Sequence, residues 1–393
     1  MSSPTQPTFT VAAGPYRAAV SLPPQLEAAA RSTLRDLIVD TDDEVPYQAT
    51  VEPDGPGSFS LSADGRLFHQ GVAAEKVPDY LIRMLLLAEL DANPGVLHLH
   101  AGLVALEGQG VTIAGLSGAG KTTLVTHLVR SGFDYGSEER VAIDPDQLTA
   151  STFPKPVSLV PGSFALFPEL DPSVTGCGQA TAMEWQVPGS TIGAGGTVSH
   201  AAVDLVVQVN YERGAAARLE PMHPATAAAV LLADSPDASR FGDRSLVVAA
   251  QFCAQARCVR LVYSQLVDAD RLVREALTSD NPDPPADVAI VAARAGTALA
   301  GPPSPDERVS WLLPRGAVLV DGRILAPTDD GSRLVELDDQ ASAWLMLLDG
   351  SQTIAELIQS VADEVGVSRA EIAAGADPLI ARLVATGVLA AEI

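Results

Sequence analysis

The pattern of hydrophobic and polar residues along the chain predicts a mixed α/β protein. Short apolar and β-branched runs over 111–114, 202–209 and 259–262 predict buried strands. Apolar residues at helical spacing predict helices over 123–130 and 267–277. Strands and helices that alternate in this way are typical of an α/β domain, and a hydrophobic content of 47% is enough for a sizeable core.

Changes in composition divide the chain into four predicted segments. Residues 1–95 predict a small α/β lobe without a catalytic constellation, which would serve packing, oligomerisation or substrate docking. Residues 96–278 predict an α/β nucleotide-binding domain. Residues 279–308 are rich in Pro, Ala, Asp and Ser and predict a linker. Residues 309–393 predict a domain of three short strands and three helices.

The stretch from Gly115 to Thr122 has the form G-x-x-x-x-G-K-T and lies between a predicted strand and a predicted helix. In this context the backbone N–H groups surround phosphate oxygens, the lysine reaches the β- and γ-phosphates, and the threonine holds Mg²⁺. We therefore expect Mg²⁺ and ATP, with GTP or pyrophosphate as alternatives. The expected nucleotide contacts are Gly115, Ser117, Gly118, Ala119, Gly120, Lys121, Thr122 and Thr123.

Two adjacent carboxylates complete a candidate phosphoryl-transfer site. Glu138 and Glu139 follow Lys121 at a distance that leaves room for a helix and a return strand. A site that binds phosphates and Mg²⁺ needs an acid that holds the metal or accepts a hydroxyl proton. We therefore place both glutamates in the site, and the alternative is a solvated turn that carries two charges.

Two histidines and one lysine are further candidates. A strand predicted over 96–106 carries His98 and His100 on one face, because residues two apart share a side. His100 is the stronger candidate for a place near the phosphates, and a structural role is the alternative for both histidines. Lys155 stands between two prolines that fix the backbone. It either neutralises phosphate charge or is a surface lysine.

The composition argues against several functions. A formal net charge of −24 disfavours binding to nucleic acids and to anionic membranes. We find no membrane-spanning segment, no signal peptide and no zinc pattern among the three cysteines, so we expect a cytoplasmic protein. The Gly- and Ser-rich stretch 171–200 predicts a mobile loop that closes over the nucleotide, or a plain surface excursion.

Three motifs resemble those of the HPr kinase/phosphorylase-like family, whose P-loop domain is similar to the phosphoenolpyruvate carboxykinase type. They are His100-Ala101-Gly102-Leu103-Val104, Gly115 to Thr122, and Glu138-Glu139. The resemblance covers about residues 96–278. Phe153-Pro154-Lys155-Pro156 is similar to a Pro-basic-Pro segment of divergent family members. The family usually has Asp-Asp in place of Glu-Glu.

The resemblance implies a role for each of five residues. Lys121 would contact the phosphates, and Thr122 would help to bind Mg²⁺. Glu138 would deprotonate the acceptor hydroxyl and Glu139 would lie near the metal. His100 would lie close to the transferred phosphate.

Residues 309–393 resemble the PqqD-like domain, or RiPP recognition element, which has a winged-helix-type α+β fold. The likeness rests on the hairpin at Asp321-Gly322, the step from Leu337-Asp338 into a helix with Trp344, Asp349-Gly350 before Thr353-Ile354, and the stretch from Leu383 to Leu389. Such domains bind the leader of a ribosomally made precursor peptide as an added strand. The candidate edge runs from Arg333 to Leu337, and Leu379 and Leu383 either line the groove or belong to the core.

These inferences predict an ATP-dependent serine/threonine-type kinase. It would phosphorylate a Ser or Thr hydroxyl of a precursor peptide that its C-terminal domain holds. Two alternatives stay open. The acceptor is a free small hydroxyl compound such as serine, or the protein is a nucleotide-binding peptide chaperone without catalysis. The expected partners are the precursor leader, other RiPP biosynthesis enzymes and further copies of this chain.

Overall fold

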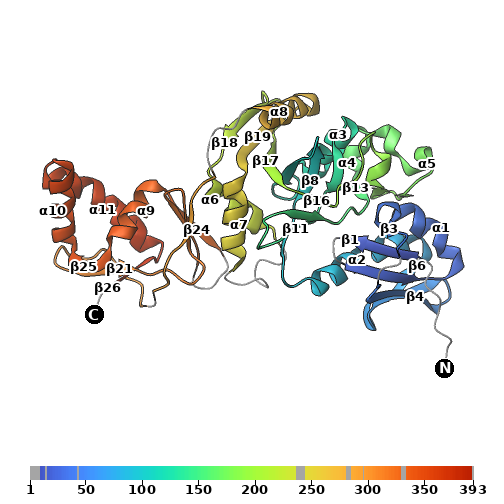
Figure 1. Ribbon diagram of the computed structural model, residues 1–393, viewed down its shortest axis with the longest axis horizontal. Helices are drawn as coiled ribbons and strands as arrows, with labels where there is room; N and C mark the ends of the chain where they lie inside the picture. The colour runs from blue at the N-terminus through green and yellow to red at the C-terminus, as the bar shows by residue number, and fades with distance from the viewer. Residues whose placement is uncertain are drawn as a thin grey trace. The chain divides into compact units, whose positions relative to one another are not determined.

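The computed structural model describes residues 9–13, 16–41, 44–235, 244–279, 285–294, 296–328 and 333–391. These residues form a mixed α/β protein with several separate sheets (Figure 1). They divide into two compact units, each of which is described by itself. Among the described residues, the first unit holds 9–222, 234–235 and 256–279, and the second holds 223–233, 244–255 and 285–391.

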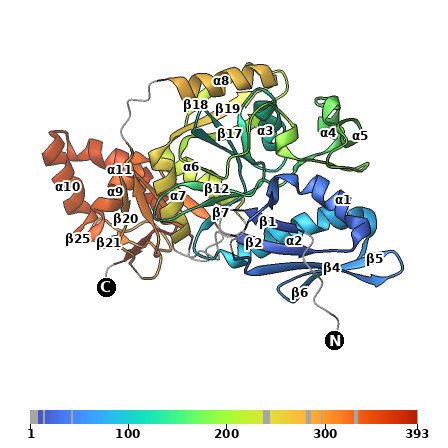
Figure 2. The same cartoon turned by 45° about the vertical axis from the view of Figure 1, so that its right-hand side comes forward.

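The N-terminal part of the first unit is a six-stranded sheet with the order β3-β1-β2-β4-β5-β6. Its strands are β1 (Phe9–Ala13), β2 (Tyr16–Ser21), β3 (Ile38–Val39), β4 (Tyr47–Gly55), β5 (Ser58–Ala63) and β6 (Arg66–Ala73). The helices α1 (Pro24–Thr33) and α2 (Val77–Ala92) share its apolar core (Figure 2). In α2 the buried residues Val77, Leu81 and Leu85 follow one another at helical spacing, so one face packs on the sheet.

The central sheet of the first unit has the order β10-β8-β9-β17-β19-β18. Its strands are β8 (Gly102–Leu106), β9 (Gln109–Ala114), β10 (Asp134–Ser137), β17 (Val203–Tyr211), β18 (Arg218–Pro221) and β19 (Arg257–Tyr263). The neighbours β9, β17 and β19 are parallel, and α3 (Lys121–Arg130) and α8 (Leu266–Thr278) pack with them in one core. Ligands of α/β proteins bind at the carboxyl ends of such strands, and β9 ends directly before Gly115.

Two small antiparallel sheets extend the first unit, with the orders β16-β12-β11-β7 and β13-β15-β14. Their strands are β7 (Leu97–Leu99), β11 (Val141–Ile143), β12 (Ala150–Thr152), β13 (Val157–Leu159), β14 (Gln179–Ala180), β15 (Trp185–Val187) and β16 (His200–Ala201). The stretch 171–200, predicted as a loop, therefore contributes strands. It does so because Val187 enters the core of the central sheet and the Trp185 ring stacks on Phe164.

The strand predicted over 96–106 is wrong as a single element. β7 pairs with β11 in a small sheet, whereas β8 pairs with β10 in the central sheet. The chain changes sheets at His100 and Ala101. The adjacent segment makes the same change of sheet between β10 and β11. This connection carries Glu138 and Glu139. Pairing on both sides of the break therefore brings His100 and the two acids to the same part of the molecule.

The second unit contains two sheets, with the orders β20-β22-β23-β24 and β25-β21-β26. Their strands are β20 (Val288–Ile290), β21 (Arg308–Trp311), β22 (Val318–Val320), β23 (Arg323–Pro327), β24 (Leu334–Leu337), β25 (Asp349–Thr353) and β26 (Leu389–Ala391). The helices α9 (Asp339–Leu347), α10 (Ile354–Val365) and α11 (Arg369–Ala385) share one apolar core with them. The three strands predicted within 309–393 correspond to β22, β23 and β24, whereas β21, β25 and β26 form a second sheet that was not predicted. β20 is a short element within the stretch predicted as a linker.

Two helices that lie between β18 and β19 in sequence belong to the second unit. These helices, α6 (Pro224–Ala233) and α7 (Arg244–Gln255), pack on each other and on the sheet that contains β22 to β24. Val318 and Leu325 are fully buried on one face of this sheet, whereas Ile324 on the other face joins the core of α9 and α11. The stretch 96–278 thus contributes to both units, since α6 and α7 contact an apolar sheet in the second one.

Candidate functional site

The loop from Gly115 to Gly120 joins β9 to α3 and has a backbone that favours glycine. Gly118 and Gly120 have φ angles of 81° and 97°. A Cβ atom on Gly120 would lie 2.6 Å from the Tyr263 hydroxyl, so this position also lacks space for a side chain. α3 begins at Lys121, directly after the loop. A glycine loop that runs into a helix N-terminus is typical of a phosphate-binding site.

The three residues that open α3 have different partners. Lys121 is 7% exposed and its Nζ donates a hydrogen bond to a loop carbonyl at 2.5 Å. The Thr122 hydroxyl donates to Glu138 Oε2 at 2.6 Å. The Thr123 hydroxyl lies 3.2 Å from the Ser163 hydroxyl. The Lys121 side chain therefore folds back on the loop, and Thr122 connects the start of α3 to Glu138. Glu138 and Glu139 are called the acid pair. Thr123 contacts Ser163 and not the acid pair.

The acid pair forms the ion pairs of the site, because both of its carboxylates contact Lys155. Glu138 is 5% exposed, and its Oε1 accepts from the Lys155 ammonium at 2.5 Å and from the Ser158 N–H at 3.3 Å. Glu139 is more exposed, with its side chain at 42%, and lies 3.0 Å from Lys155 Nζ. The alternative of a solvated turn does not describe Glu138, because its carboxylate is buried and fully engaged.

Lys155 is 2% exposed, which contradicts the alternative of a surface lysine. Burial by itself lowers the pKa of Lys155, but the charges of Glu138 and Glu139 outweigh burial and raise this pKa above its usual value. The ammonium in turn lowers the pKa of Glu139, against the effect of burial. Lys155 and Glu139 are therefore both charged at neutral pH in this arrangement.

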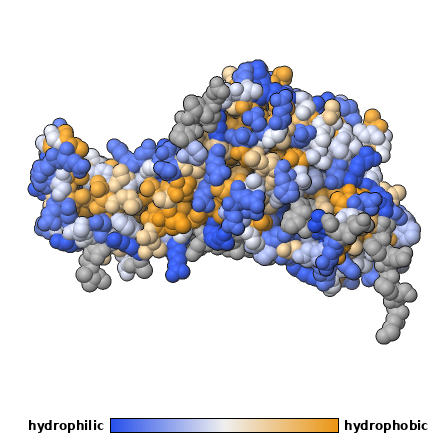
Figure 3. Space-filling view, in the orientation of Figure 1, coloured by the Kyte–Doolittle hydropathy of each residue, from blue (hydrophilic) through white to orange (hydrophobic). Residues whose placement is uncertain are grey.

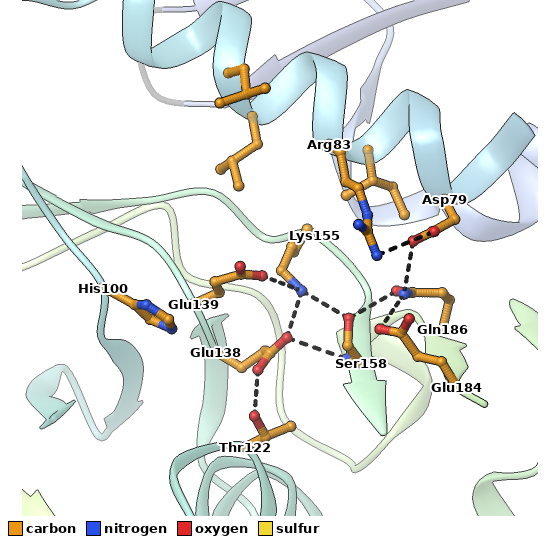
Figure 4. Close-up of a pocket in the computed structure, with 13 residues that line it drawn as sticks. Asp79, Arg83, His100, Thr122, Glu138, Glu139, Lys155, Ser158, Glu184 and Gln186 are labelled. Atoms are coloured by element: carbon orange, nitrogen blue, oxygen red, sulfur yellow. Dashed lines mark hydrogen bonds and ion pairs between the residues drawn. The ribbon is translucent and has the colours of Figure 1, made fainter. Parts of the chain in front are cut away.

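These groups line a cavity of about 520 Å³ (Figure 4). One wall carries the predicted residues His100, Thr122, Glu138, Glu139 and Lys155, and the other wall is α2. The lining residues that the sequence analysis missed are Asp79, Ile82, Arg83, Leu86, Leu87, Ser158, Glu184 and Gln186. The N-terminal lobe, to which no site residue was assigned, therefore supplies five of the thirteen lining residues.

A hydrogen-bond chain crosses the pocket from the acid pair to α2. Ser158 Oγ accepts from Lys155 at 3.1 Å and donates to Gln186 Oε1 at 3.2 Å. Gln186 Nε2 donates to Asp79 at 3.4 Å, and Asp79 pairs with Arg83 at 3.4 Å (Figure 4). The only feature of the sequence that points to this series of hydrogen bonds is that Asp79 and Arg83 stand one helical turn apart. That spacing is common on exposed helix surfaces.

The two histidines have separate surroundings, which corrects the prediction that they share a face. His100 lines the pocket, and its Nδ1 lies 3.4 Å from Asp234 Oδ2. His98 is fully buried; one ring nitrogen contacts a backbone carbonyl at 3.0 Å and the other contacts Arg140. Arg140 also pairs with Glu89 of α2 at 2.5 Å. Only His100 therefore faces the site, and His98 belongs to a buried ionic cluster.

The candidate peptide-binding edge lies in the second unit. β24 pairs with β23 alone among the described strands, so it is the edge at one end of its sheet. Apolar atoms gather over this part of the unit on the face seen in Figure 3. Leu383 is fully buried and belongs to the core, and Leu379 packs against the same core.

Residues 321–389 match the family model described as coenzyme PQQ synthesis protein D (PqqD). None of the curated proteins matches the sequence. Among solved structures, the Hpr(Ser) kinase/phosphatase from Coxiella burnetii is similar at 12% identity over 45% of this chain and 94% of that chain, with a TM-score of 0.26.

Among the described residues, no helix is long and apolar enough to cross a membrane. No group of three or more His, Cys, Asp and Glu side chains that could hold a metal ion occurs there. The chain thus joins a region at 321–389 that matches the PqqD model to an α/β part whose motifs resemble those of HPr kinase/phosphorylase-like proteins.

Proposed function

We propose that this protein is an ATP-dependent kinase that phosphorylates a Ser or Thr hydroxyl of a ribosomally made precursor peptide. The observation that carries the proposal is the hydrogen bond of 2.6 Å from Thr122 to Glu138, which joins the glycine loop to the acid pair inside one pocket. In the proposed assignment the first unit contains a P-loop kinase domain of the HPr kinase type, and the second contains a winged-helix-type PqqD-like domain.

The donor set at the glycine loop fits a magnesium–nucleotide complex. Mg²⁺ is usually held by one or two carboxylates together with phosphate oxygens and waters, so an all-protein cage is not required. Thr122 and Glu139 would hold the ion, which would neutralise charge on the transferred group. The backbone of the loop and Lys121 would contact the phosphates, and Lys155 would add a second positive charge at the acid pair.

The proposed reaction forms a bond between the acceptor oxygen and the γ-phosphorus and breaks the bond from that phosphorus to the bridging oxygen of ADP. Glu138 accepts the proton of the acceptor hydroxyl. The Thr122 hydroxyl and the Lys155 ammonium hold this carboxylate at 2.6 and 2.5 Å, so its position is fixed before the acceptor arrives. Catalysis of this kind depends on positioning and charge neutralisation.

The C-terminal domain would supply the acceptor. We propose that the precursor leader adds to β24 as a further strand, with backbone hydrogen bonds for affinity. Because the leader site and the kinase site belong to one chain, binding of the leader raises the local acceptor concentration to the order of millimolar. A pocket with weak intrinsic affinity for the acceptor is then sufficient.

The test is the intact mass of the precursor peptide encoded beside this protein, after incubation with the full chain, ATP and Mg²⁺. Free serine is offered in a parallel reaction. A gain of one phosphate on the peptide, lost in Lys121→Ala, supports the proposal. Phosphorylation of serine alone favours the small-molecule alternative. An unchanged peptide that still binds the protein rejects the kinase and leaves the chaperone.

A further inference from the structure

A carboxylate from outside the sequence motifs lies against two residues that the proposed function assigns to phosphates. Asp234 Oδ2 lies 3.4 Å from His100 Nδ1 and 3.7 Å from Lys121 Nζ. This oxygen is buried and has no hydrogen-bond partner among the described residues, although 41% of the side chain is exposed. The carboxylate therefore points at the phosphate-binding side chains and is not committed to any other donor there.

The chain on both sides of Asp234 is held in place. The Ser235 hydroxyl donates to the carbonyl of His98, at the edge of the first unit's small sheet. Immediately before Asp234 the helix α6 ends. Within the second unit, Thr226 of α6 donates to Glu336 of β24 at 2.6 Å. Asp234 thus directly follows α6, and α6 is hydrogen-bonded to the candidate peptide-binding edge.

We propose that Asp234 takes the place of the γ-phosphate in the nucleotide-free protein and is displaced when ATP binds. The proposal rests on the proposed function, since it takes Lys121 and His100 as phosphate contacts. A carboxylate and a phosphate oxygen carry the same charge and seek the same cation, so they compete for Lys121. ADP lacks the γ-phosphate and offers Lys121 only its β-phosphate, so it displaces Asp234 less than ATP does.

The connection to α6 gives this displacement a second consequence. When Asp234 moves, the end of α6 moves with it, and α6 is bonded to β24 through Thr226. Linkage between two binding sites is reciprocal, so a change at β24 alters ATP affinity by the factor by which ATP alters binding at β24. Occupation of the peptide edge and occupation of the nucleotide site are therefore coupled through Asp234.

The first test measures the affinity of the full chain for a non-hydrolysable ATP analogue and for ADP, each with Mg²⁺, by calorimetry. Asp234→Asn is expected to tighten binding of the ATP analogue roughly tenfold and to tighten ADP binding clearly less. The matched control Asp146→Asn removes one charge from an exposed turn of the same unit and is expected to change neither affinity.

Weaker binding of the ATP analogue in Asp234→Asn would overturn the inference and identify Asp234 as a ligand of the nucleotide complex. Equal tightening for both nucleotides would also overturn it, since the effect would then not concern the γ-phosphate. If neither nucleotide binds the unmodified chain in a manner that depends on Lys121, the proposed function itself fails.

The second test is a double-mutant cycle with Thr226→Val, which removes the hydrogen bond between α6 and β24. In the unmodified background this change is expected to shift the affinity for the ATP analogue by about twofold or more. In the Asp234→Asn background it is expected to have no effect. An identical shift in both backgrounds, or no shift in either, would overturn the coupling through α6.

Discussion

Lys155 is the residue on which the charge arrangement of the site depends. It is almost completely buried, and its ammonium neutralises Glu138 and Glu139 at 2.5 and 3.0 Å. A buried ion pair adds little net stability, because desolvation offsets the attraction. Removal of one partner is far more costly, since it leaves an uncompensated buried charge. The role of Lys155 can therefore be separated from that of its partners by paired substitutions.

We expect Lys155→Met to lower the free energy of unfolding by about 3–5 kcal/mol. The double variant Lys155→Met, Glu138→Gln is expected to recover most of this loss, because no buried charge then lacks a partner. Denaturant-induced unfolding of both variants measures the difference. The exposed Lys76 is the control, and Lys76→Met is expected to change the stability by less than about 0.5 kcal/mol. No recovery in the double variant would show that Lys155 acts through packing alone.

Glu138 is expected to be sensitive to both charge and length. Glu138→Gln removes the proposed base and is expected to lower kcat by about 10²–10⁴-fold while nucleotide still binds. Glu138→Asp retracts a carboxylate that reaches both Thr122 and Lys155, and a misplacement of roughly 1 Å costs up to about 10²-fold. Peptide phosphorylation followed by mass measures kcat. Full activity of Glu138→Gln would contradict the assignment of the base.

The helix α2 belongs to the lobe for which packing, oligomerisation or substrate docking was predicted without any site residue, and it becomes part of the pocket. One face of α2 packs in the core of the N-terminal lobe, and Asp79, Arg83, Leu86 and Leu87 line the pocket. The buried ion pair of Glu89 and Arg140 joins the same helix to the segment that carries the acids. α2 therefore forms the wall opposite the glycine loop, where an acceptor and not the nucleotide would lie.

Substitutions on α2 are accordingly expected to affect the acceptor more than ATP. Arg83→Ala leaves the glycine loop intact and removes a cation from the pocket wall. We expect a several-fold higher KM for the acceptor peptide and an unchanged KM for ATP. Arg66→Ala, at an exposed position outside the pocket, is the control. A change in KM for ATP alone would place the nucleotide, and not the acceptor, against α2.

The helix α9 offers a pH-dependent test in the second unit. The Asp338 carboxylate caps α9 by accepting from the Ala341 N–H, and this bond, together with Arg382, lowers the pKa of Asp338. A group with a lowered native pKa stabilises the fold above its unfolded pKa, about 3.9, and loses this contribution as pH falls through the native value. The cap therefore contributes at neutral pH and not in strong acid.

We expect Asp338→Ala to cost about 0.5–2 kcal/mol at pH 7, the usual value for loss of an N-cap. The difference from the unmodified protein should shrink as the pH is lowered below about 4. Asp338→Asn keeps a capping oxygen at every pH and should lose much less. Thermal unfolding of the three proteins over a pH series gives the comparison. A pH-independent cost of the alanine variant would contradict the role of the charged cap.

Within the whole molecule, the sequence order of the elements does not follow the division into compact units. The helices α6 and α7 come from the middle of the stretch 96–278, yet they pack with the C-terminal sheet. The chain therefore passes from the first unit to the second and back twice before it reaches β19. The second unit, which contains the PqqD-like region, is thus connected to the first unit at several points along the chain.

If the leader tethers the precursor, phosphorylation by the whole chain is expected to depend on the leader. Removal of the leader from the precursor is expected to raise the KM for phosphorylation by about 10²–10⁴-fold with little change in kcat. The isolated leader, added in excess, should inhibit phosphorylation of the full precursor but not of the truncated one. Steady-state kinetics with the full chain checks both effects. Equal KM values for the two peptides would reject a leader-dependent mechanism.

The sequence by itself determined the features that depend on neighbouring residues. The glycine loop between β9 and α3 follows from an apolar run, glycines that tolerate positive φ, and a helical repeat, all within one stretch. The match of residues 321–389 to the PqqD model likewise depends on local sequence. Such features can be predicted because backbone conformation and periodicity are local properties.

Only the tertiary structure decided which distant residues meet. The two-residue spacing of His98 and His100 predicted one face, but β7 ends at Leu99, so that His98 lies within the strand and His100 lies beyond it. The pocket wall of α2 and the contact of Asp234 with Lys121 join residues far apart in the chain. Single polar residues on helices and turns have no local signature, because their role depends on packing between elements that the local sequence does not specify.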